Sequence, residues 1–132
     1  IWPNYFFKPH YIGTTYHIID RYVDTGEIIH QNLAKLNSKF GLHELICSAN
    51  KAAFDDIKFV LKHINLRIKK RIKPNKNKSL IIKGKTFKRS DFNPEIYNVI
   101  YGYYKDKISE VFLKNNKNYK KPKIISLNRK SK

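Results

Sequence analysis

The chain is poor in the features that anchor a protein in a membrane or staple it outside the cell. Its 132 residues include one cysteine, Cys47, which cannot form an internal disulfide. The sequence has neither a near-continuous apolar run of about 18 residues nor a signal-peptide pattern. We therefore expect a cytoplasmic protein with no membrane partner, and not a disulfide-bonded secreted scaffold.

Glycine clusters and metal-ligand clusters are also scarce. The five glycines stand apart from one another, so the sequence has no glycine-rich phosphate loop. Five histidines and one cysteine show no paired ligand spacing, and we expect no metal site, although His17, His30 and Asp24 could converge in space. Cys47 lies among apolar residues of a predicted helix, which indicates a buried structural cysteine.

Acidic residues are scarce in the second half of the chain. Residues 1–56 carry 5 basic and 6 acidic side chains, whereas residues 57–132 carry 23 basic side chains against 4 acidic ones. Such a field attracts polyanions, nucleic acid among them. The cations are 23 lysines and 5 arginines, and lysine supplies unspecific attraction more than geometric recognition. The basic half can therefore be interpreted as a nucleic-acid-binding surface or as a solvated lysine coat, and the sequence does not decide between the two.

The apolar pattern predicts one α/β domain that begins with a strand, a loop and a strand. β-branched and aromatic residues indicate a strand over residues 13–19 and a second strand over residues 27–33. Between them, Asp24-Thr25-Gly26 has turn chemistry, because aspartate can bond its own downstream amides and glycine can adopt positive φ. Apolar residues at steps of three and four then predict a helix over residues 41–66 that packs across the strands.

The rest of the chain is more polar. Residues 69–83 are predicted to be a lysine-rich linker, and a short strand or an extended arm is expected up to Phe87, with the arm beginning at Gly84. Asn93-Pro94-Glu95 signals the start of a second long helix, which the apolar stripe carries to about Leu113. We expect residues 114–132 to be a disordered basic tail. Residues 1–12 should form an irregular segment over the core. Their apolar side chains would normally need upstream structure to cover them, which is typical of the later part of a larger protein.

One segment resembles a known family. Gly13-Thr14-Thr15-Tyr16-His17-Ile18-Ile19-Asp20, followed by Val23-Asp24-Thr25-Gly26-Glu27-Ile28-Ile29 and Gln31, is similar to the signature of the folate-dependent formyltransferases. The combination is a Gly-Thr strand that ends in histidine, a fixed gap, Asp-Thr-Gly, and an apolar pair followed by glutamine. It covers about twenty residues closely and residues 1–113 loosely, with residues 1–68 as the later half of the catalytic domain and residues 84–113 as an arm and closing helix.

The resemblance implies a partial Rossmann-like fold, made of the last strands and two long helices, and an enzyme that transfers a formyl group from 10-formyltetrahydrofolate to a primary amine. It implies that Asp24 handles the protons of the transfer and that His17 orients its carboxylate. The loop around them would line the folate pocket, through Asp20, Arg21, Tyr22, Val23, Thr25 and Gly26. A plain turn aspartate and a satisfied core histidine are the alternative interpretations of the two catalytic candidates.

The family also uses an upstream asparagine and histidine to hold the formyl oxygen, and neither has a match here. We therefore expect the chain alone to have little or no activity. A nucleotide-linked amino sugar is the expected acceptor, with methionyl-tRNA as the second candidate. The sequence leaves open whether the chain forms a homodimer. A non-catalytic basic module that binds nucleic acid is the alternative from another functional class.

Overall fold

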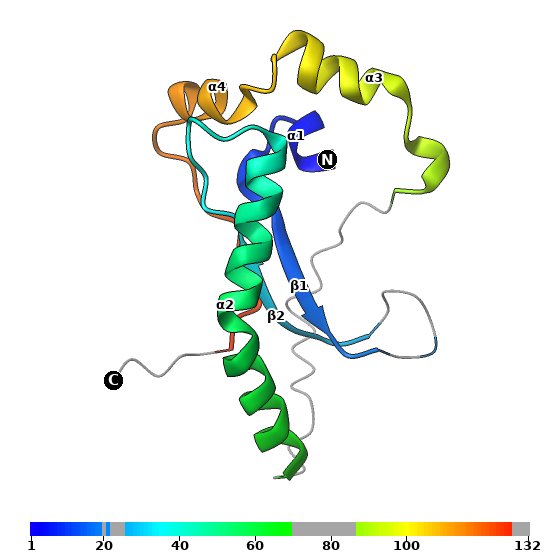
Figure 1. Cartoon of the computed structure of the whole chain (residues 1–132), viewed down its shortest axis with the longest axis vertical. Helices are drawn as coiled ribbons and strands as arrows, with labels where there is room; N and C mark the ends of the chain where they lie inside the picture. Colours follow the sequence, from blue (N-terminus) through cyan, green and yellow to red (C-terminus); the bar gives the residue numbers. More distant parts are fainter. Residues whose placement is uncertain (20, 22–25, 70–86, 128–132) are drawn as a thin grey trace.

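The computed structural model describes residues 1–19, 21, 26–69 and 87–127, with only the helical backbone for residues 66–69. The described part is mixed α/β, which confirms the coarse fold class (Figure 1). Its regular elements are, in chain order, α1 (Trp2–Tyr5), the 3-10 helix η1 (Pro9–Tyr11), β1 (Gly13–His17), β2 (Ile28–Leu33), α2 (Leu42–Lys69), the 3-10 helix η3 (Arg89–Asp91), α3 (Pro94–Tyr97), the π-helix η4 (Asn98–Tyr103) and α4 (Ile108–Asn115).

Strands β1 and β2 form the predicted antiparallel hairpin. Gly13 pairs with Leu33 and Tyr16 with His30, and a bulge shifts the register so that His17 pairs with Ile28. Residues of alternating position along a strand face opposite sides, and Tyr16 points to α2, where its hydroxyl donates to the carbonyl of Ala53. Figure 1 shows α2 lying across the hairpin.

The core lies between the N-terminal half of α2 and the helices near both ends of the chain. Leu42, Leu45 and Ala49 lie one and two turns apart on the buried face of α2, and they pack against Ile96 of α3 and Ile100 of η4. The prediction of a helix over residues 41–66 is confirmed, and the helix continues to Lys69. Burial of apolar surface stabilises a fold by about 25 cal/mol per Å². This cluster is therefore the main stabilising contact among the described elements.

Residues 1–12 lie over this core, as expected, but they are more regular than their prolines indicate. They contain α1 and η1, each with a proline at its start. Trp2 packs against the core and stacks on Phe87, with ring centroids 4.1 Å apart and planes 12° apart. The stack joins the N-terminal segment to the first described residue of the predicted arm. Linker residues 70–83 and arm residues 84–86 lie outside the described residues.

The predicted second long helix is interrupted in the structure. Its predicted start is confirmed, because Asn93 Oδ1 accepts from the Glu95 amide at 3.0 Å. The helix then passes into η4 and breaks at Lys105 and Asp106, whose φ angles are 48° and 56°. The break sets the Asp106 carboxylate at the start of α2, where Oδ1 accepts from the Leu42 amide at 2.8 Å. The prediction of one continuous helix to Leu113 is wrong because a distant helix end uses this turn as its cap.

The C-terminal segment predicted to be disordered is ordered up to Leu127. Residues 114–127 are not a detached tail, since α4 extends to Asn115 and Tyr119 packs on Phe112 with ring centroids 5.4 Å apart. The chain then runs beside β2, where the Gln31 amide donates to the Ile125 carbonyl at 2.8 Å. The prediction of disorder is wrong for these residues, and residues 128–132 lie outside the described part. Among the described helices, none is both long and apolar enough for a membrane span.

Candidate functional site

The predicted site lies at the loop that connects the two strands of the hairpin, and the structure describes part of it. His17, Arg21 and Gly26 are described. The other five predicted site residues lie outside the described residues, and they are Asp20, Tyr22, Val23, Asp24 and Thr25. The structure therefore gives the frame that holds the loop, and the position of the Asp24 carboxylate stays a prediction.

The hairpin remains paired up to the start of this loop. The Ile18 amide donates to the Glu27 carbonyl at 2.9 Å, one step beyond the end of β1. This bond fixes both ends of the connection between residues 18 and 27. His17 is therefore held immediately before the loop that carries the predicted folate-binding residues.

His17 is half-buried and has a defined ring hydrogen. Its Nδ1 lies 3.1 Å from the Ile18 carbonyl oxygen, and because a carbonyl only accepts, Nδ1 donates. In the neutral ring Nε2 is then the acceptor nitrogen. In this tautomer Nε2 is the ring nitrogen that can accept a hydrogen bond.

Position 26 requires a glycine because a side chain would not fit there, and not because of the backbone angles. No described glycine has a positive φ, so the expected left-handed turn role of Gly26 is wrong. A Cβ on Gly26 would instead collide with the backbone carbonyl of Ile18. The same holds at the other end of the hairpin, where a Cβ on Gly13 would collide with the carbonyl of Asn32. Both glycines of the resembling segment thus permit close approach of the two strands.

A buried polar cluster on β2 was missed by the sequence analysis. His30 is 4% exposed, and its Nε2 lies 3.0 Å from Asn32 Oδ1 and 3.3 Å from Asp56 Oδ2 of α2. Its Nδ1 lies 3.2 Å from the Leu127 amide, which donates. Nδ1 accepts, so Nε2 carries the hydrogen that the oxygens share. The alternation of His30 and Asn32 along the strand was the available signal that both face α2.

The glutamine of the resembling segment has a structural role. Gln31 Oε1 accepts from the Ile125 amide at 3.0 Å, while Nε2 donates to Thr15 Oγ1 at 3.3 Å. Together with the backbone bond from Gln31 to Ile125, this carboxamide clamps residues 122–127 onto β2. The clamp joins the hairpin to a segment 94 residues further along the chain.

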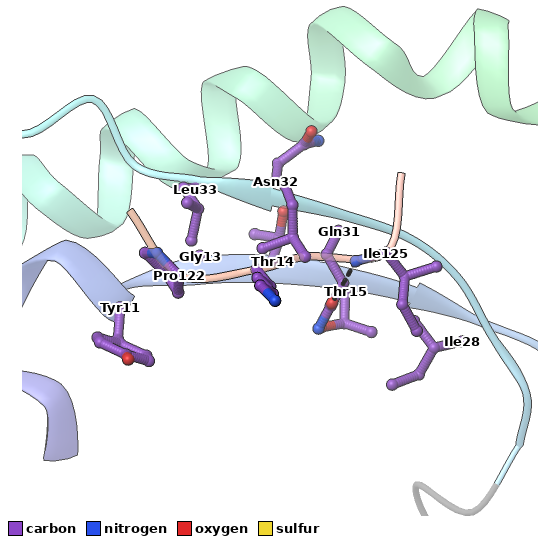
Figure 2. Close-up of a pocket in the computed structure, with 12 residues that line it drawn as sticks. Tyr11, Gly13, Thr14, Thr15, Ile28, Gln31, Asn32, Leu33, Pro122 and Ile125 are labelled. Atoms are coloured by element: carbon purple, nitrogen blue, oxygen red, sulfur yellow. Dashed lines mark hydrogen bonds between the residues drawn. The ribbon is translucent and has the colours of Figure 1, made fainter. Parts of the chain in front are cut away.

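A groove of about 390 Å³ lies between the hairpin and this clamped segment (Figure 2). Figure 2 shows Tyr11 at one end of the groove and Ile28 at the other, with Thr15 and Gln31 between them. Residues 122–125 form its remaining wall. The volume falls in the range of small-molecule pockets.

Cys47 is not where the sequence analysis placed it. The prediction of a buried structural cysteine is wrong, because Cys47 is exposed. Two residues along a helix correspond to a turn of about 200°, so Cys47 lies nearly opposite the fully buried Leu45. Its Sγ lies 3.5 Å from His43 Nε2 on the same outer face. Among the described residues, no three side chains of metal-ligating type are grouped to hold an ion.

Comparison of the chain with protein-family models, curated proteins and solved structures gives no match. The formyltransferase resemblance therefore rests on the residues of the hairpin segment alone.

Proposed function

We propose that this chain carries the donor-binding hairpin of a folate-dependent N-formyltransferase, within a partial Rossmann-like sheet. The observation that supports the proposal is that the resembling segment folds as one closed hairpin. The Ile18–Glu27 bond and the contact between Gly26 and the Ile18 carbonyl fix its loop at both ends. The candidate catalytic histidine, His17, immediately precedes that loop.

The reaction joins the amine nitrogen to the formyl carbon and breaks the bond between that carbon and N10 of the folate. One proton leaves the amine and one is delivered to N10, so the net change is a proton transferred between two nitrogens. Asp24 is proposed to take the amine proton. Asp24 is then proposed to deliver a proton to the N10 leaving group, which closes the proton balance, and His17 is proposed to orient the Asp24 carboxylate.

The donor is proposed to be 10-formyltetrahydrofolate, held by loop residues 20–23 with Thr25 and Gly26. A nucleotide-linked amino sugar is the proposed acceptor, because residues 84–113 resemble the closing part of the small sugar enzymes, and methionyl-tRNA is second. The chain has no match for the asparagine and histidine that hold the formyl oxygen in the family. The 132 residues alone should therefore bind the donor and transfer the formyl group slowly or not at all.

Donor binding by the chain as it stands tests the proposal. Isothermal titration with 5-formyltetrahydrofolate, a stable isomer of the donor, should give a saturable signal. Replacing residues 20–25 by a Gly/Ser loop of equal length keeps Gly26 and the paired strands, and should abolish that signal at an unchanged melting temperature.

Asp24→Asn is the matched control variant for donor binding. It should keep folate binding within about threefold, because the proposed role of the carboxylate is proton transfer and not affinity. Absence of folate binding to the wild-type chain, or equal binding by the loop replacement, would refute the proposal.

A further inference from the structure

The basic C-terminal segment, residues 114–127, is held in place against the body of the protein. Tyr119 lies 5.3 Å from the His10 ring and 5.4 Å from the Phe112 ring, measured between centroids. Further along, Ile125 and Leu127 are hydrogen bonded to Gln31 and His30. The positive charges of this segment are therefore carried on a backbone that the hairpin and η1 position.

This segment has a uniform charge. Residues 111–127 contain no aspartate or glutamate. Five lysines project from it, all of them exposed, and they are Lys114, Lys117, Lys120, Lys121 and Lys123. Lysines so spaced attract phosphates without reading base sequence.

An exposed aromatic ring lies beside these charges. Tyr11 is 51% exposed and lines the groove together with Pro122 (Figure 2). Lys123 also lines the groove. Lys8 Nζ lies 5.8 Å from the centre of the Tyr11 ring. Thr15 and Gln31 add hydroxyl and carboxamide groups to the wall of the groove.

We propose that this groove and the basic segment bind single-stranded nucleic acid, with a base stacked at Tyr11 and phosphates along the lysines. A groove of about 390 Å³ admits one nucleotide but not a duplex. A basic track beside an exposed aromatic ring is the usual arrangement of sequence-tolerant single-strand binders. The proposal is independent of formyl transfer, because the residues to which it assigns binding lie outside residues 18–27.

Binding of a fluorescein-labelled ten-nucleotide oligouridylate, followed by anisotropy between 50 and 200 mM salt, tests the lysines. Changing Lys120, Lys121 and Lys123 together to serine should weaken binding and reduce the salt slope by about 2, at roughly 0.7 for each lost phosphate contact. The matched control changes Lys51, Lys58 and Lys62 of α2 to serine, which removes the same charge from another surface. Its salt slope should stay within about 0.5 of the wild type.

Tyr11 tests the stacking contact. Tyr11→Ala should weaken binding about 5- to 150-fold, while Tyr11→Phe should stay within about twofold because it keeps the ring. Tyr97→Ala, which removes another half-exposed tyrosine from α3, should have no effect. Equal losses from both lysine triples, wild-type affinity in Tyr11→Ala, tighter binding of a duplex of equal length, or binding of anionic lipid vesicles but not of the oligonucleotide would each overturn the proposal.

Discussion

The hydrogen bond between Asp106 and the first turn of α2 links two elements 64 residues apart, and its removal should be measurable. Asp106 Oδ1 accepts from the Leu42 amide at 2.8 Å, so the carboxylate satisfies one of the amides that a helix start leaves without a partner. Its negative charge also lies at the positive end of the helix dipole. Asp106 itself has φ of 56°, which aspartate and asparagine tolerate better than alanine does.

These contributions predict different costs for two substitutions. Asp106→Asn keeps an acceptor oxygen and the backbone tolerance, and loses the charge, so it should cost about 0.3–1 kcal/mol. Asp106→Ala loses the cap, worth about 1–2 kcal/mol, and adds about 1 kcal/mol for alanine at positive φ. The alanine variant should therefore lose about 2–3 kcal/mol, which corresponds to a decrease in Tm of roughly 6–12 °C for a chain of this size.

Urea denaturation of the two variants and of the wild type, followed by circular dichroism, measures these differences. Asp55→Ala is the control, because it removes a carboxylate from the exposed face of the same helix and should change stability by less than about 0.5 kcal/mol. The penalty of Asp106→Asn should shrink in 1 M NaCl, since salt screens the dipole contribution. Equal costs for the alanine and asparagine variants, or a cost in Asp55→Ala as large as in Asp106→Ala, would refute the cap.

Three further predictions concern other contacts. Burial, and then the neighbouring positive charge, lowers the pKa of His10; the unfolded chain then binds the proton first, so stability should fall as pH drops below about 6.5. In thermal melts between pH 5 and 8, His10→Phe should flatten this dependence and His43→Gln, at an exposed position, should not. Gln31→Leu removes two side-chain hydrogen bonds, so hydrogen exchange at the Ile125 amide should accelerate about tenfold; an unchanged rate would exclude the clamp. Cys47 should react fully with a maleimide without denaturant, and protection would place it in the core.

Local pattern was sufficient to predict the hairpin and α2. The strand predicted over residues 27–33 is β2 within one residue, and the helix predicted over 41–66 differs from α2 by one residue at its start and three at its end. Both are governed by near neighbours along the chain: alternation in the strand and steps of three and four in the helix. Cys47 was misplaced because α2 has apolar residues on two faces, and Ile46 and Phe54 are exposed.

Non-local contacts account for the elements that the sequence did not predict. The apolar stripe of the second helix continues through Tyr104 and Ile108, so its periodicity gives no sign of the break that the cap on α2 requires. The lysines of residues 114–127 likewise obscure an extended segment whose bonds are made to His30 and Gln31. Contacts between side chains and backbone over more than 60 residues leave no periodic signal.

The contacts in the hairpin divide the resembling segment into two kinds of residue. Gly13 and Gly26 would meet a carbonyl if they carried a Cβ, and Gln31 holds Thr15 and Ile125, so any hairpin of this geometry and with this clamp would favour those residues. Their presence therefore supports the fold more than the chemistry. Asp24 lies outside the described residues, and the formyl-transfer proposal depends on it. A variant at a glycine tests whether the hairpin forms, and only the loop replacement and Asp24→Asn, made in an intact hairpin, test what the loop does.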